Sequence, residues 1–219
     1  MGKIVQAAKI THVPTIWMSH TTKEFAGIRQ PAIDGYAKIR AAAITSKVDT
    51  FVVFDTHWIV NQGFHLNAKP RHQGSFISHE LPHMLSDMDY DFQGDTELSG
   101  LIIEEVHNAG HRALGHDHPA MGVEYGTLLP MYFINQGSYA RVIPVATNQF
   151  SSIEENRSFG AAVARAIERS DRRVAVLASG SLSHSFWPNH LSVEGINKVN
   201  GEFNRQMDLR VLELWQAGR

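Results

Sequence analysis

The sequence predicts an α/β fold: one domain with a central, mostly parallel or mixed sheet flanked by helices, and an active site at the carboxyl ends of its strands. Thr50–Trp58 begins with a continuous run of bulky apolar residues, which is typical of a strand buried on both faces. A helical pattern precedes this run, in the order of a βαβ unit. Three strand-like runs are followed by His12, His57 and His184, as a shared site at one sheet edge requires.

Composition limits the class of protein. A chain of 219 residues that is 43% hydrophobic can bury one substantial core, so we expect one domain. The net charge of −2 gives no basic field that would attract nucleic acid or an anionic membrane. No apolar run has transmembrane length, and the N-terminus lacks the apolar core of a signal peptide, so we expect a cytoplasmic protein.

The first half of the chain is expected to supply the centre of the sheet. Lys3–Thr11 is predicted to be a first strand, which Pro14 ends because it cannot donate to a ladder. Apolar residues at helical spacing between 33 and 48 predict the helix that leads into the central strand. A short alternating run at 64–68 predicts an edge strand. The segment Lys69–Gly94 is interpreted as a long functional loop with one short helix.

The second half continues the alternation. A helix over 98–109 is predicted, with Asp95 or Thr96 as its cap and Gly110 as its end. A second polar loop is expected from Gly115, running into 124–131. Ser152 and Glu155 form a capping-box pattern before another helix. The other predicted elements are strands at Tyr139–Thr147 and Asp171–Ala178 and a long final helix carrying Ile196, Val199, Phe203, Met207, Val211 and Leu214.

The chain has thirteen histidines and no cysteine, so any metal must be held by His, Asp or Glu. A single His at a strand end is more often a hydrogen-bonded structural residue than a ligand. Two imidazoles from His12 and His57 suit iron(II), manganese or zinc, and a carboxylate would complete a facial triad. His184 follows a run of small residues and is interpreted as an acid/base. A serine hydrolase is disfavoured because Ser181 is not in a G-x-S-x-G motif.

Five motifs, in this order along the chain, resemble the class III extradiol ring-cleavage dioxygenases. The similarity runs from Lys3 to the end of the chain. The motifs are Lys9-Ile10-Thr11-His12-Val13-Pro14, Phe54-Asp55-Thr56-His57-Trp58, Glu80-Leu81-Pro82-His83, Glu124-Tyr125-Gly126-Thr127 and Ala178-Ser179-Gly180-Ser181-Leu182-Ser183-His184.

This resemblance implies a non-haem iron(II) enzyme of aromatic catabolism that opens a small aromatic diol with O2 to a muconic semialdehyde. It implies that His12 and His57 are Fe(2+) ligands and that His184 is the acid/base residue. Tyr125 stands where many members have a His, as in the branch that cleaves homoprotocatechuate or aminophenol-like rings. We expect its hydroxyl to contact the substrate and to act in catalysis.

The two polar loops and the large helical faces lead to two further predictions, one about substrate contacts and one about oligomeric state. His83 and His116, one on each loop, are predicted substrate contacts. The large helical faces predict a homo-oligomer.

The family's third iron ligand is a Glu beyond the long C-terminal helix, and no Glu of this chain matches that position. We therefore expect that residues 1–219 form one catalytic domain lacking its C-terminal segment, with the third ligand beyond residue 219. The alternative is a substitute carboxylate such as Asp55 or Glu80.

Two other functions stay open from the residues alone. One is a zinc-dependent hydrolase built on the same histidines, with metal-bound hydroxide as the nucleophile. The other is a non-catalytic binding protein of the same fold that holds no metal. Metal analysis distinguishes the three functions, because they predict iron, zinc or no metal.

Overall fold

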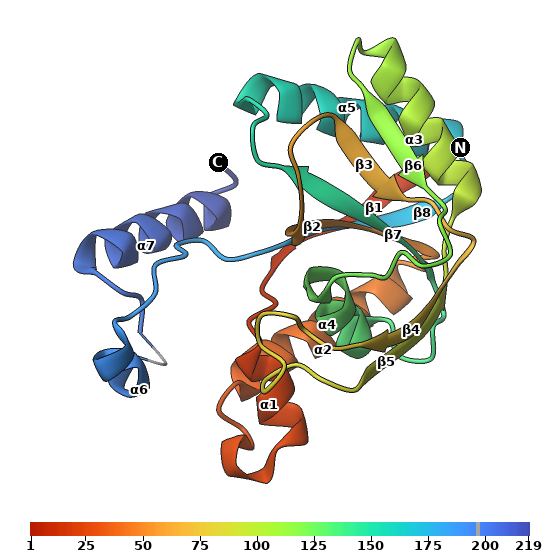
Figure 1. The fold of residues 1–219 in the computed structure, drawn as a ribbon. Coiled ribbons are helices and arrows are strands. Elements are labelled where there is room, and N and C mark those ends of the chain that lie inside the picture. The colour runs from red at the N-terminus through yellow and green to blue at the C-terminus, as the bar shows by residue number, and fades with distance from the viewer. Residues whose placement is uncertain (196–197) are drawn as a thin grey trace. The chain divides into compact units, whose positions relative to one another are not determined.

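The computed structural model describes residues 1–195 and 198–219 (Figure 1). The chain divides into two compact units, Met1–Gly180 and Ser181–Arg219, which are treated separately below. The expectation of one catalytic domain over 1–219 therefore stays a prediction. Within the described residues, no helix has both the length and the apolar character needed to cross a membrane.

A six-stranded sheet forms the centre of the first unit, as the sequence predicts (Figure 1). Every neighbouring pair is parallel except β3 and β7, which are antiparallel. The prediction of a mostly parallel sheet in an α/β fold is thus confirmed. In spatial order the strands are β1 (Lys3–Ile10), β8 (Arg173–Ser179), β2 (Thr50–Val60), β7 (Arg141–Asn148), β3 (Phe64–Asn67) and β6 (Ala113–His116).

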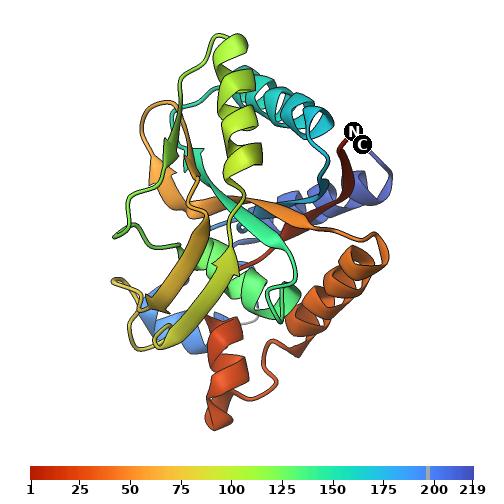
Figure 2. The same cartoon turned by 90° about the vertical axis from the view of Figure 1, so that its right-hand side faces the viewer.

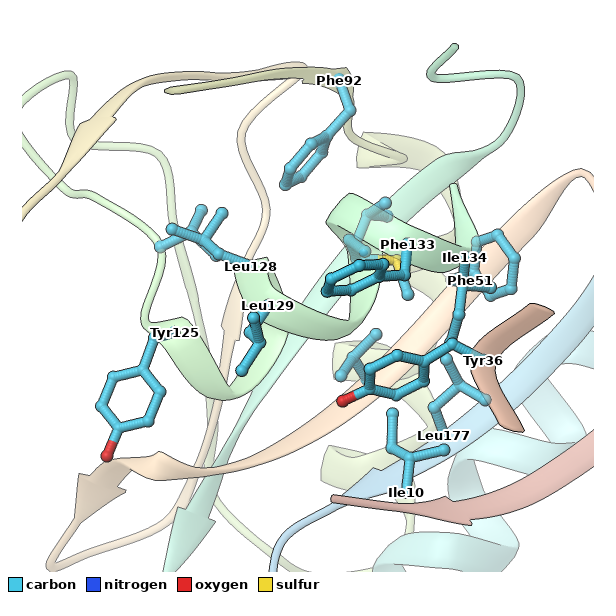
Figure 3. Packing of buried hydrophobic residues seen from close by; sticks show 14 of the residues in the cluster. Ile10, Tyr36, Phe51, Phe92, Tyr125, Leu128, Leu129, Phe133, Ile134 and Leu177 are labelled. Atoms are coloured by element: carbon cyan, nitrogen blue, oxygen red, sulfur yellow. The ribbon is translucent and has the colours of Figure 1, made fainter. Parts of the chain in front are cut away.

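Helices cover both faces of this sheet (Figures 1 and 2). On one face lie α2 (Gln30–Thr45) and α4 (Tyr125–Ile134), and on the other lie α3 (Thr96–Asn108) and α5 (Ile153–Arg169). The apolar run of β2 serves both cores: Phe51 and Val53 join the first cluster, shown in Figure 3, and Val52 joins the second. A strand between two helical layers needs apolar residues at every position, which explains the unbroken run.

The predicted helix ends are also confirmed. The Asp95 side chain accepts a hydrogen bond from the Leu98 amide at 3.0 Å at the start of α3. Gly110 follows α3 with a φ of 81°, which glycine adopts without strain. Ser152 and Glu155 form the full capping box of α5. The segment after β1 is more ordered than expected and contains α1 (Thr15–Thr21) and a short 3-10 helix (Lys23–Phe25).

The expectation of a long loop with one helix over Lys69–Gly94 is wrong. This segment contains an antiparallel pair, β4 (Arg71–Phe76) and β5 (Met88–Gln93), joined by residues 77–87. The strands were hidden because β4 is mostly polar. Its buried position is His72, which is fully buried and lies beside Phe92.

Three smaller expectations also need correction. The run at 64–68 is β3, but it is not an edge strand, because β6 pairs outside it and takes Gly115 and His116 from the predicted second loop. Residues 125–134 form the helix α4, not a loop, and most of its residues are buried. β6 is short, and α4 lacks clear amphipathic periodicity, so the pattern of apolar residues did not predict either element.

The predicted long C-terminal helix is divided. The second unit contains a 3-10 turn (Asn189–Leu191), α6 (Ser192–Gly195) and α7 (Glu202–Gln216). Val199 lies between these helices, and Ile196 lies outside the described residues. Gly201, with a φ of 86°, precedes α7 and sets its start.

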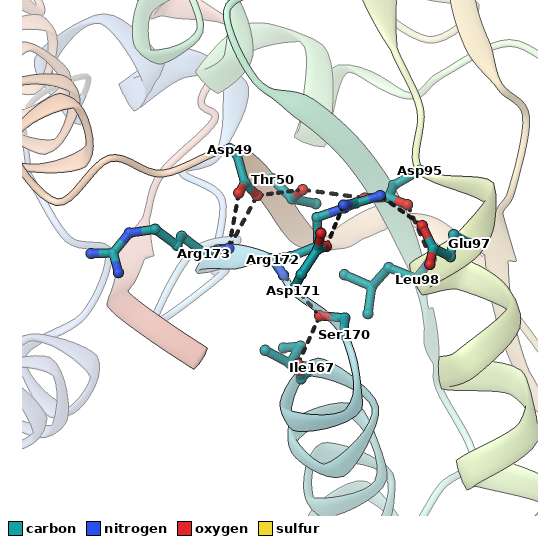
Figure 4. A network of polar contacts seen from close by, with 10 residues as sticks. All are labelled: Asp49, Thr50, Asp95, Glu97, Leu98, Ile167, Ser170, Asp171, Arg172 and Arg173. Carbon is teal, nitrogen blue, oxygen red and sulfur yellow. Dashed lines mark hydrogen bonds and ion pairs between the residues drawn. The ribbon is translucent and has the colours of Figure 1, made fainter. Parts of the chain in front are cut away.

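A polar network braces the edge of the sheet opposite the predicted site (Figure 4). The buried Asp95 carboxylate caps α3 with one oxygen and accepts from the Arg172 Nε with the other at 2.6 Å. Arg172 also pairs with Glu97 at 2.9 Å and Asp171 at 2.5 Å. The start of β8 is thereby joined to the start of α3.

We predict that Asp95→Ala lowers the free energy of unfolding by about 3 to 5 kcal/mol, because it leaves the mostly buried Arg172 without its main partner. Urea unfolding measures the change. Asp91→Ala is the matched control, since it removes an Asp–Arg pair in which both side chains are about half exposed. Equal effects of the two substitutions would contradict the structural role assigned to Asp95.

Candidate active site

The sheet register brings the carboxyl ends of three strands together. Ile10 at the end of β1 pairs with Ser179 at the end of β8, and Ser179 pairs on its other side with Asp55 of β2. His12 follows Ile10 by two residues, and His57 follows Asp55 by two. The two predicted ligands therefore lie on either side of the end of β8.

A bulge in β2 sets the position of His57. The pairing of β2 with β7 shifts between Asp55 and Ile59, so three residues of β2 have no counterpart in the ladder. Within the bulge, the Asp55 Oδ1 accepts hydrogen bonds from the amides of His57 at 2.8 Å and Trp58 at 3.3 Å. Bulges commonly redirect a side chain at the end of a strand, and this one directs His57 toward His12.

The imidazole rings of His12 and His57 meet edge to face, with their centroids 4.9 Å apart. His12 is 5% exposed. The structure thus brings together the two histidines that the sequence predicts as metal ligands.

Hydrogen bonds fix the tautomer of His12. Its Nδ1 lies 2.8 Å from the Ser179 Oγ, and that hydroxyl donates its proton to the Gly126 carbonyl at 2.5 Å. Because a hydroxyl has one proton, Ser179 must accept from His12, so His12 carries its proton on Nδ1. The Nε2 lone pair is then the one that can bind a metal.

Tyr125 contacts the second histidine. It is the first residue of α4 (Figure 3), not a loop residue as expected. Its hydroxyl is hydrogen-bonded to the His57 Nε2. Burial raises the pKa of the Tyr125 phenol, and the nearby carboxylates of Glu80, Asp55 and Glu124 raise it further. The phenol therefore stays protonated, and it donates to the His57 Nε2 when that ring carries its proton on Nδ1.

The next two residues of α4 hold the Asp55 carboxylate. The Thr127 hydroxyl donates to the Asp55 Oδ2 at 2.7 Å. A Cβ at Gly126 would lie 2.0 Å from the Asp55 Oδ1, so only glycine allows α4 to approach this closely. Asp55 is fully buried, and burial raises its pKa although the hydrogen bonds oppose the shift.

The other predicted site residues do not all lie beside His12 and His57. His116, in β6, contacts His65 at 2.9 Å and lies beside Trp58, whereas His83 lies in the exposed loop between β4 and β5. His184 belongs to the second unit, where its ring packs against Phe186. The catalytic role of His184 and the substrate contacts of His83 and His116 therefore stay predictions.

The donor set fits a metal site in part. The described residues contain no group of three or more His, Cys, Asp or Glu side chains arranged to hold a metal. Asp55 is a poor substitute ligand, because its oxygens accept three hydrogen bonds from the protein. Nevertheless, two facing imidazoles are the nitrogen half of a facial triad, and the tautomer of His12 leaves its Nε2 unprotonated, so the residues present fit two of its ligands.

Sequence reasoning did not assign Ser179 and Thr127 to the site. Both hydroxyls brace a functional residue across a long sequence separation, 167 residues for Ser179 and His12 and 72 for Thr127 and Asp55. Both lie inside the quoted motifs, which is the only sequence signal that could have indicated them.

Comparison with known proteins is consistent with this site. Residues 6–219 match the family described as the catalytic LigB subunit of aromatic ring-opening dioxygenase. The chain is 42% identical to the 3,4-dihydroxyphenylacetate 2,3-dioxygenase of Escherichia coli over 222 residues, which span all of this chain and 80% of that protein.

Two relatives from a Pseudomonas species are more distant. The 2-aminophenol 1,6-dioxygenase beta subunit is 28% identical over 84% of this chain and 63% of its own length, and the alpha subunit is 27% identical over 68% and 53%. The extent of the family match and the identity to the Escherichia coli enzyme confirm the resemblance seen in the five motifs. The chain belongs to the LigB family of aromatic ring-opening dioxygenases.

Proposed function

We propose that this ring-opening dioxygenase cleaves 3,4-dihydroxyphenylacetate, or a related catechol or aminophenol, to a muconic semialdehyde with iron(II) held by His12 and His57. The pairing of the two imidazoles at 4.9 Å carries the proposal. The printed name of the Escherichia coli relative supports the substrate, and those of the Pseudomonas relatives support the aminophenol alternative. A third ligand, a Glu beyond residue 219, is part of the proposal.

When bound, iron(II) supplies the oxygen chemistry and a shared coordination sphere for the diol and O2. The residues of the chain position the substrate and transfer protons to and from it. The Tyr125 phenol, held protonated, is positioned to donate to a substrate oxygen once it leaves the His57 Nε2. His184 takes a phenolic proton from the substrate and returns it later, as a general base and then a general acid.

We further propose that the enzyme works as a cytoplasmic homo-oligomer. The aminophenol relatives are named as alpha and beta subunits, which supports association between chains in this family.

We expect the full-length protein, reconstituted with iron(II) under anaerobic conditions, to consume O2 and form a yellow ring-opened product when 3,4-dihydroxyphenylacetate and O2 are added. An oxygen electrode and absorbance spectroscopy measure the two changes. A protein reconstituted with zinc is the control. Equal turnover with zinc, without O2 uptake, would replace the proposal with a hydrolase.

We predict that Tyr125→Phe strengthens iron(II) binding and lowers kcat/KM. Removing the hydroxyl removes the hydrogen bond that a metal must displace at the His57 Nε2, but it also removes a hydrogen bond to the substrate worth about 0.5 to 1.5 kcal/mol. Anaerobic metal titration and steady-state kinetics with several catechols measure the two effects. A Phe variant with unchanged kinetics would assign Tyr125 to packing alone.

We predict that Ser179→Ala weakens metal binding by about 10- to 100-fold, because His12 loses the partner that keeps the proton on Nδ1. NMR of the ring nitrogens in the metal-free protein should show a change of tautomer. Ser99→Ala is the matched control: Ser99 is also fully buried, and its hydroxyl has no partner among the described residues. If the two variants bind metal equally, the tautomer argument fails.

A further inference from the structure

A pocket of about 310 Å³ lies in the first unit, next to the residues of the candidate site. Asp55 and Trp58, from the β2 bulge, line it, as does Glu124, the residue before Tyr125. Asn67 of β3 lies on its wall. The volume is at the lower end of the range for small-molecule sites. His12 and His57 are not among its described lining residues.

Asn67 gives the pocket an acceptor without a partner. This side chain is 1% exposed, and its Nδ2 donates to the Gly122 carbonyl at 3.1 Å. Its Oδ1 is buried and has no hydrogen-bond partner in the described part of the chain. A buried acceptor is costly when it stays unpaired, so this oxygen favours an occupant that carries an N–H or O–H donor.

The charge of the pocket is negative. Asp55, Glu124 and His79 line it, and no lysine or arginine is among its described lining residues. The Asp55 oxygens are occupied by the bulge amides and Thr127, whereas Glu124, the N-cap residue of α4, makes no side-chain capping bond. Glu124 is therefore available to a ligand. A ligand carboxylate would meet repulsion, and a cation would be attracted.

Aromatic rings complete the lining. Trp58, Phe76 and Tyr90 surround the polar groups. Such rings pack against an aromatic ligand, and their faces also attract an ammonium group. The described lining thus combines apolar walls with acceptors, and it contains no lysine or arginine that would pair with an acid.

We propose that this pocket binds a small aromatic amine, whose ammonium group donates to the Asn67 Oδ1 and the Glu124 carboxylate while its ring packs among Trp58, Phe76 and Tyr90. The site goes beyond the proposed function and does not depend on a bound metal. It also excludes the carboxymethyl group of 3,4-dihydroxyphenylacetate from this compartment.

Calorimetry of the full chain with three phenols that differ in one substituent tests the proposal. Tyramine carries an ammonium, 4-hydroxyphenylacetate a carboxylate and 4-ethylphenol no charge, and none of them has the second hydroxyl of a catechol. We expect tyramine to bind at least about tenfold more tightly than the acid. Equal affinities would show that charge does not select the ligand, and no binding of tyramine would show a pocket that holds only water; either result would overturn the proposal.

Two substitutions test whether tyramine binds in this pocket. Glu124→Gln removes the charge, and Asn67→Leu removes the acceptor at similar volume; each should weaken tyramine binding by about tenfold or more. Glu154→Gln, at an exposed position in the first turn of α5, is the matched control and should leave binding unchanged. Circular dichroism checks the fold, and Glu124→Gln alone decides the test if Asn67→Leu does not fold.

Tyramine binding that survives both substitutions would place the ligand elsewhere and overturn the proposal. These outcomes are independent of the metal, so they are distinguishable from a failure of the dioxygenase proposal.

Discussion

The site depends on burying one carboxylate between a strand and a helix. Asp55 has no exposed surface, and its desolvation is costly unless its oxygens are hydrogen-bonded. The bulge amides supply hydrogen bonds from β2, and Thr127 supplies one from α4. Because these donors come from two elements, satisfying Asp55 fixes the shape of the bulge and the position of the helix together. The direction of His57 follows from that shape.

The first turn of α4 extends this constraint to both histidines. Three consecutive residues act on three different groups: Tyr125 on His57, the Gly126 carbonyl on Ser179 and Thr127 on Asp55. All the later residues of α4 except Tyr132 are buried, with Leu128 and Leu129 in the main core, so this turn rests on a packed element (Figure 3). Sites held by packed helices and strands keep their geometry better than sites on loops.

The parts that could be predicted from the sequence depend on short-range pattern. The apolar run of β2, the capping box of α5 and the histidines after β1 and within β2 are all visible locally. The β4–β5 hairpin was not visible, because its one fully buried polar residue, His72, interrupts any apolar alternation. The tautomer of His12 was equally hidden, since it depends on a serine 167 residues away and on a helix whose pattern resembles a loop.

The hydrogen bonds also bear on how the buried His12 and the half-buried His57 could serve as the proposed metal ligands. The Ser179 hydroxyl accepts a hydrogen bond from the His12 Nδ1, so His12 needs no second proton, and the protonated Tyr125 phenol can donate to the His57 Nε2. Metal ligation requires the unprotonated nitrogen in each ring. The same contacts that make the histidines acceptable inside the protein are therefore compatible with the form that binds metal. Under the proposed function, the Tyr125 phenol would exchange its hydrogen bond with His57 for one with the substrate when His57 binds the metal.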